Sequence, residues 1–168
     1  VNWDYIAQNV KAMRAEKPRV LNLFAYTGGA SLAACAAGAD VTHVDSIKQV
    51  VTWSNENMQI SNLQDIRWMV EDALKFVQRE VRRGNTYHGI ILDPPAFGHG
   101  PKGEKWKLEE NIAEMMRGNL TPGKGIVEVF ASICKTDWIT ESLIEEIKIQ
   151  LDSLKIPSNV NFSSATIS

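Results

Sequence analysis

A short apolar run that stops at two glycines constrains this chain more than any other stretch. The apolar and β-branched residues from Val20 to Phe24 suit a strand buried on both faces. Gly28 and Gly29 follow, and glycine lets a backbone turn sharply and approach a ligand closely. An alanine-rich helix is predicted over residues 30–37, with its free N–H groups directed at that ligand. The stretch therefore predicts a strand, a turn and a helix that together cradle a ligand.

Taken alone, this unit leaves more than one interpretation open. The segment from Thr27 to Ser31 does not fit the Gly-x-Gly-x-x-Gly pattern of proteins that bind dinucleotide cofactors. A nicotinamide or flavin dinucleotide is therefore the less favoured ligand. The two glycines could also simply make a turn between strand and helix. Later segments have to decide between these interpretations.

The composition limits the classes of protein to consider. A length of 168 residues fits one domain, and 18 Lys+Arg against 20 Asp+Glu exclude a general polyanion binder, so any nucleic-acid contact must come from a local patch. No run of about 18 apolar residues appears, and we expect a soluble, cytoplasmic protein with no membrane contact. Cys35 and Cys134 lie far apart without metal-type spacing, which favours a reducing compartment and no metal site.

Strand and helix patterns alternate along the chain. A lead-in helix is predicted over residues 2–17, before Pro18, and its apolar face comprises Trp3, Ile6, Val10 and Met13. Further strands are predicted over 41–44, 66–70, 87–92 and 126–131, and further helices over 47–61, 73–83, 108–118 and 136–154. The alternation predicts an α/β fold, a Rossmann-like doubly wound, mostly parallel sheet with helices on both faces, in one domain over 1–168.

Acidic residues follow two consecutive predicted strands. Asp45 follows the second strand, where doubly wound sheets place an acid that accepts hydrogen bonds from both hydroxyls of a ribose. Asp72 follows the third strand, where it could accept from an adenine amino group. Each acid could instead cap the next helix. Two such acids in succession favour adenosine recognition over two coincidental caps.

The fourth strand ends in Asp93-Pro94-Pro95-Ala96-Phe97, the most informative segment of the chain. Two prolines fix φ and remove two backbone donors, which stiffens the loop and leaves its carbonyls free as acceptors. Asp93 is then held at the mouth of the sheet, and Phe97 offers a flat face on which a planar group can stack.

A glycine-rich, basic loop is predicted next, over residues 98–103. Lys102, Lys105 and Lys107 surround Trp106 and could contact a phosphate backbone beside the site. A mobile, solvated lid is the competing interpretation.

These motifs resemble the class I S-adenosylmethionine-dependent methyltransferases, in particular the bacterial branch that includes large-subunit ribosomal RNA methyltransferases. The segments that carry the resemblance are Val-Leu-Asn-Leu-Phe-Ala-Tyr-Thr-Gly-Gly, Val-Thr-His-Val-Asp-Ser, Ile-Arg-Trp-Met-Val-Glu-Asp-Ala-Leu-Lys-Phe and Ile-Leu-Asp-Pro-Pro-Ala-Phe-Gly-His-Gly. The resemblance covers about residues 20–110 and fades beyond Met116. Members of this branch usually carry flanking recruiting regions and strands, so we expect this chain to be a catalytic core that lacks them.

The resemblance implies S-adenosylmethionine as cofactor, S-adenosylhomocysteine as product and RNA, ribosomal by expectation, as substrate. The cofactor residues it implies are Phe24, Ala25, Tyr26, Thr27, Gly28, Gly29, Asp45, Ser46, Asp72, Ala73 and Asp93. The implied catalytic residues are Asp93, Pro94 and Phe97, and the implied substrate residues are Pro95, Phe97, Lys102 and Trp106.

The chemistry of the substrate loop favours N-methylation of an RNA base. Asp93 and the Pro94 carbonyl could accept the two N–H bonds of an exocyclic amino group while Phe97 stacks the base. The rival is a 5-methylcytosine enzyme with Cys134 as nucleophile, although related enzymes place that cysteine where Ile133 stands here. Methylation of a small-molecule or protein amino group, a non-catalytic cofactor-binding module and a dinucleotide oxidoreductase remain as further alternatives.

Overall fold

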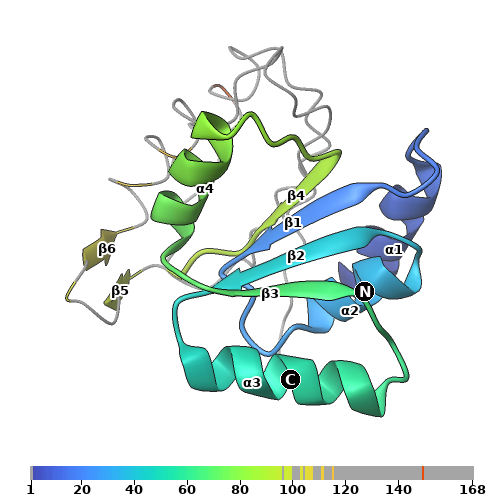
Figure 1. Cartoon of the computed structure of the whole chain (residues 1–168), viewed down its shortest axis with the longest axis horizontal. Coiled ribbons are helices and arrows are strands. Elements are labelled where there is room, and N and C mark those ends of the chain that lie inside the picture. The colour runs from blue at the N-terminus through green and yellow to red at the C-terminus, as the bar shows by residue number, and fades with distance from the viewer. Residues whose placement is uncertain are drawn as a thin grey trace.

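The computed structural model describes residues 2–95, 97–99, 103, 105–107, 111, 115 and 149. A parallel sheet with strand order β3-β2-β1-β4 lies at its centre (Figure 1). The strands are β1 (Arg19–Leu23), β2 (Asp40–Asp45), β3 (Ile66–Val70) and β4 (Gly89–Leu92). Successive strands are added on one side of β1 until β4 pairs on its other side, so the order reverses between β1 and β4. Doubly wound sheets bind ligands at such a switch point, outside the carboxyl ends of the strands.

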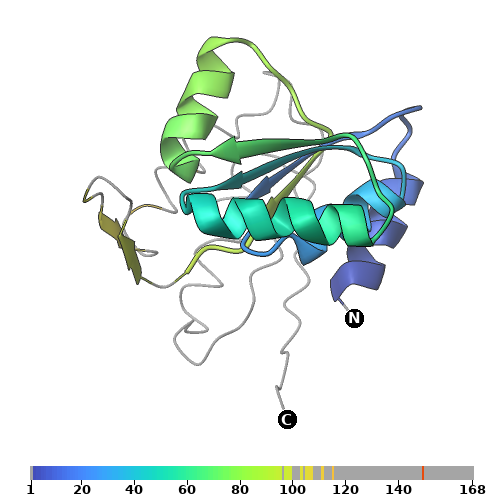
Figure 2. The same ribbon diagram turned by 60° about the horizontal axis from the view of Figure 1, so that its bottom comes forward.

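Helices cover both faces of the sheet. Figure 2 shows α4 (Ala73–Arg82) on one face, and α1 (Asn2–Ala12), α2 (Gly29–Ala36) and α3 (Lys48–Ile60) on the other. The register aligns Val20, Val41 and Ile66 on the face toward α1 and α2, where they join a buried apolar cluster. The prediction of an α/β, Rossmann-like sheet with helices on both faces is therefore confirmed.

Two predicted elements and one predicted buried residue differ from the structure. α1 ends at Ala12 instead of residue 17, and Pro18 disfavours helical backbone at Lys17, the residue before it. Trp3, expected on the buried face of this helix, is 63% exposed. The strand predicted from residue 87 begins at Gly89.

The prediction of a loop over residues 98–103 is wrong at Gly98 and His99, which belong to a strand. β5 (Phe97–His99) and β6 (Lys105–Lys107) pair as an antiparallel hairpin, with Gly103 between them at a φ of 83°. The positive φ at Gly103 explains why a glycine suits this connection.

Several predictions fall outside the described residues. These are the turn at 120–125, the strand at 126–131 and the tail at 160–168, together with Ala96, Lys102 and Cys134. Of the two later helices, only Asn111, Met115 and Ile149 are described, each in helical conformation. Within the described part of the chain, no helix is long and apolar enough to cross a membrane.

Candidate active site

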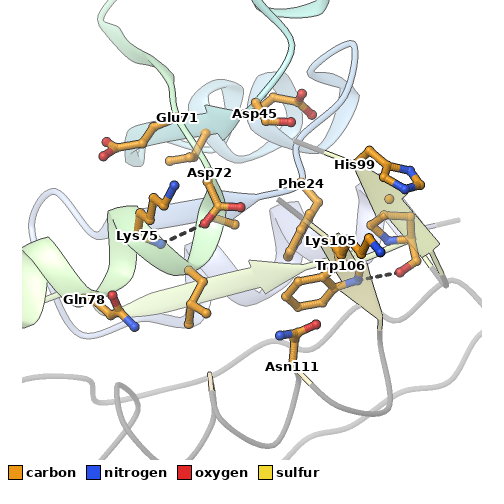
Figure 3. Close-up of a pocket in the computed structure, with 16 residues that line it drawn as sticks. Phe24, Asp45, Glu71, Asp72, Lys75, Gln78, His99, Lys105, Trp106 and Asn111 are labelled. Atoms are coloured by element: carbon orange, nitrogen blue, oxygen red, sulfur yellow. Dashed lines mark hydrogen bonds between the residues drawn. The ribbon is translucent and has the colours of Figure 1, made fainter. Parts of the chain in front are cut away.

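A cavity of about 330 Å³ opens at the carboxyl ends of β2 and β3 (Figure 3). This volume is at the lower end of the range for small-molecule sites. Its walls come from the ends of β1, β2 and β3, the first turns of α4 and the β5–β6 hairpin. The predicted site residues among its lining are Phe24, Asp45, Ser46, Asp72, Ala73, Pro95 and Trp106.

Asp45 ties the end of β2 to the loop after β1. Its Oδ2 accepts a hydrogen bond from the backbone N–H of Tyr26 at 3.0 Å, and its Oδ1 accepts from that of Ile47 at 2.9 Å. Because each carboxylate oxygen carries two lone pairs, both can still accept from a ligand hydroxyl. The bond to Ile47 also shows that the acid orders the approach to α3, whose N-cap is Ile47.

Asp72 is the N-cap of α4, as the alternative interpretation held. Its Oδ1 accepts from the backbone N–H of Lys75 at 3.0 Å (Figure 3). The side chain nonetheless lines the cavity, with buried Ala73 beside it. The cap fixes the direction of the carboxylate, and it leaves acceptor capacity for a polar group in the cavity.

An aromatic wall closes the cavity on the hairpin side. The rings of Phe24 and Trp106 lie 4.7 Å apart between centroids, at 54°. Trp106 donates its indole N–H to the Pro95 carbonyl at 2.7 Å. One buried side chain thus joins the cavity, the hairpin and the loop after β4.

A second cavity, of about 210 Å³, lies at the switch point between β1 and β4. Its lining residues are Trp3, Ile6, Asn22, Phe24, Ala25, Tyr26, Thr27, Gly28, Gly29, Ala30, Ile91 and Asp93. Phe24 lines both cavities. The acids Asp45, Asp72 and Asp93 therefore stand along one edge of the sheet, as expected.

Glycine is required twice in the turn that floors the second cavity. Gly28 has a φ of 88°, and an added Cβ would lie 3.1 Å from the Cβ of Ser54. At Gly29 an added Cβ would lie 2.6 Å from the Trp3 ring, which leans over the turn from α1. Backbone conformation and close packing both exclude larger residues here.

Side chains of α3 hold the same turn, which sequence reasoning missed. Ser54 donates its hydroxyl to the Tyr26 carbonyl at 2.7 Å, and Asn57 donates its amide to the Thr27 carbonyl at 3.0 Å. These bonds support a strained segment, because Phe24 and Tyr26 have φ values of 56° and 47°. No local sequence signal reveals them, since each joins residues about thirty positions apart.

A buried polar chain lies beneath the turn. Asn22 of β1 donates to the Ser31 hydroxyl at 2.9 Å, and this hydroxyl lies 3.0 Å from Nδ1 of His43 on β2. All three side chains are at most 1% exposed, and burial lowers the pKa of His43 to about 4. His43 is therefore neutral at pH 7, and its Nε2 has no hydrogen-bond partner among the described residues.

The side chains of the loop after β4 differ in their exposure to solvent. Asp93 and Pro95 are exposed while Pro94 is buried, and Phe97 is 72% exposed at the start of β5. Asp93 lines the second cavity and Pro95 the first, so the loop borders both.

Some lining residues of the first cavity were not predicted. Glu71 forms an ion pair with Arg79, and Lys75, Gln78, His99, Lys105 and Asn111 complete its polar wall (Figure 3). Glu71 stands next to Asp72 at the end of β3, which was a usable signal. His99 and Lys105 could be placed only by the hairpin pairing.

Comparisons with known proteins agree on one class. A family model described as S-adenosylmethionine-dependent methyltransferase matches residues 6–159. A ribosomal RNA large subunit methyltransferase K/L of Shewanella frigidimarina is 33% identical over 109 residues, which are 62% of this chain and 15% of the relative. A protein of Methanocaldococcus jannaschii named "Putative ribosomal RNA large subunit methyltransferase MJ1653" is 37% identical over 92 residues, which are 54% of this chain and 24% of the relative. The chain thus spans less than a quarter of either relative's length.

Solved structures are similar over a larger share of the chain. The SAM-dependent methyltransferase from Agrobacterium tumefaciens is 39% identical with a TM-score of 0.77, over 89% of this chain and 49% of that one. A structure named SMU.776, complexed with SAH, is 25% identical with a TM-score of 0.71, over 92% of this chain and 40% of that one.

Proposed function

Because this chain belongs to the S-adenosylmethionine-dependent methyltransferase family, we propose that it transfers a methyl group from that cofactor to an amino group of an RNA base. The observation that carries the proposal is the pair of cavities that share Phe24 as a lining residue, one lined by Asp93 and the other by Pro95 of the loop after β4. The family membership agrees with the predicted cofactor and argues against the alternative of a dinucleotide oxidoreductase.

The two cavities match the two ends of the cofactor. The first cavity takes the adenosine: Asp45, with Ser46 beside it, accepts from the ribose hydroxyls, and Asp72 accepts from the adenine amino group next to Ala73. The second cavity takes the methionine part along the turn Phe24, Ala25, Tyr26, Thr27, Gly28 and Gly29. Supporting this placement, the turn continues into the N-terminus of α2, whose free N–H groups favour a carboxylate.

The protein's contribution to the reaction is alignment. The bound cofactor supplies an activated methyl group on a positively charged sulfonium. Asp93 and the Pro94 carbonyl accept the N–H bonds of the target amino group, which directs its lone pair at that methyl. Phe97, which is 72% exposed, stacks the base. The prolines hold these acceptors in place, since they restrict the loop backbone.

The names of the relatives support RNA, and specifically ribosomal RNA, as the substrate class. Both curated relatives described above are named for ribosomal RNA of the large subunit. The family model, which matches residues 6–159, covers the residues of the site. Single-stranded or extruded bases suit a site with an exposed aromatic ring at its mouth.

The test is transfer of labelled methyl groups to total RNA, protein extract and small metabolites from cells that lack the gene. We expect label in RNA, recovered after hydrolysis as an N-methylated base. Asp93→Asn should lower transfer by about a hundredfold or more, as for loss of a positioned acceptor. Because Asp93 also lines the second cavity, S-adenosylmethionine binding is measured separately to distinguish loss of the acceptor from loss of the cofactor. Asp40→Asn, at the opposite end of β2, is the matched control and should retain activity. Label confined to protein or metabolites would refute RNA as the substrate.

Cys134 defines the alternative reaction, carbon methylation of cytosine. It lies outside the described residues, so its prediction as a nucleophile stays open. Cys134→Ser should leave methyl transfer unchanged if the amino-group reaction is correct. Loss of transfer in this variant, with 5-methylcytosine as the parent's product, would favour the alternative.

A further inference from the structure

We infer that the outer face of the β5–β6 hairpin binds the phosphate backbone of a single-stranded RNA segment next to the target base. This inference rests on the proposed function and adds to it the surface that holds the substrate. The surface comprises Phe97, His99, Lys105 and Lys107, which we call the hairpin face.

The pairing of the hairpin places these side chains together. Phe97 lies opposite Lys107, His99 lies opposite Lys105, and Gly98 lies opposite Trp106. Residues directly opposite each other in an antiparallel pair point to the same side, and neighbours along a strand alternate. The four residues of the hairpin face are accordingly exposed, whereas Trp106 is buried. His99 and Lys105 also line the first cavity, so the hairpin face borders that cavity.

The inner side of the hairpin fixes this face relative to the site. Trp106 packs on Phe24 and donates a hydrogen bond to the Pro95 carbonyl. Gly98 lies on the same side, where an added Cβ would be in ordinary contact, at 3.7 Å, with both Pro95 Cγ and Trp106 Cβ. An RNA segment bound to the hairpin face is therefore held at a fixed distance from Asp93 and Pro94.

The chemistry of the hairpin face fits single-stranded RNA. Two lysine ammonium groups attract phosphates, and an exposed aromatic ring stacks an unpaired base. Alternate residues of a strand are about 6.6–6.8 Å apart, which is close to the separation of successive phosphates in an extended single strand. The chain carries a net charge of -2, so attraction of a polyanion requires a local group of this kind.

Binding of fluorescein-labelled oligouridine, followed by fluorescence anisotropy over a range of salt concentrations, tests the inference. The test variant is Lys107→Gln, and the matched control is Lys11→Gln, an exposed lysine away from the hairpin. Loss of one phosphate contact should reduce the slope of log affinity against log salt by about 0.7. A fourfold rise in salt should then cost the parent about 2.6-fold more affinity than the test variant.

Three further measurements make the outcome decisive. Cofactor affinity of the test variant should equal that of the parent, because Lys107 lines neither of the two cavities described above. An unchanged slope and affinity for oligouridine would overturn the inference, and so would equally strong, lysine-dependent binding of oligoglutamate. If total RNA receives no label while lysine-dependent oligouridine binding persists, the base-methylation proposal fails and the hairpin face stands.

Discussion

The buried histidine beneath the glycine turn makes the stability of this protein depend on pH in a predictable direction. His43 is fully buried, and its pKa is lowered to about 4, whereas an unfolded chain has a histidine pKa near 6.5. The unfolded state therefore binds a proton more readily than the folded state between these values. Stability from this group is complete above pH 6.5 and is lost as the pH falls toward 4. Acidification from pH 7 to pH 5 should cost about 2 kcal/mol, at 1.36 kcal/mol for each unit below the unfolded pKa.

Urea unfolding at pH 7 and pH 5 measures this cost, and His43→Gln isolates it. The variant removes the titrating ring, so its loss of stability on acidification should be smaller than the parent's by about 2 kcal/mol. Titration of the three histidine ring signals by NMR provides an independent measurement. If all three signals titrate near pH 6.5, or if parent and variant lose equal stability, the burial argument is incorrect.

Two other substitutions examine the turn and the aromatic wall. Gly28→Ala should lose cofactor affinity and about 1–2 kcal/mol of stability, because φ is positive and Ser54 is close. Its control is Gly38→Ala, where φ is 100° but no atom lies within 4 Å of an added Cβ. Isothermal titration with S-adenosylmethionine compares the cofactor affinities of the two variants. Trp106→Phe removes the bond to Pro95 and should reduce RNA methylation about tenfold with little change in cofactor affinity. Trp53→Phe on α3 is its control, and an equal loss there would contradict the reasoning.

The central sheet could be predicted because its signals are local. Each strand is a short run bounded by polar or turn residues, and strands that alternate with helices leave few possible topologies. The acids at the strand ends could be placed for the same reason: the carboxyl ends of parallel strands share one edge. Asp45 and Asp72 required no tertiary contact to be located.

The hairpin and the polar chain could not be predicted because they depend on pairing. Around residue 98 the glycines indicate a loop, and only the contact of Trp106 with Phe24 and Pro95 explains an ordered hairpin. Nothing in the local sequence around Ser31 or His43 indicates that the two side chains form a buried hydrogen bond. They come together only when the register of β1 and β2 sets Asn22 beside His43.

The position of Phe24 between the two cavities sets a rule for altering this protein. Because Phe24 lines both cavities, a change in its size should alter the two together. Redesign of either cavity should therefore treat Phe24 and Trp106, its ring partner, as one unit.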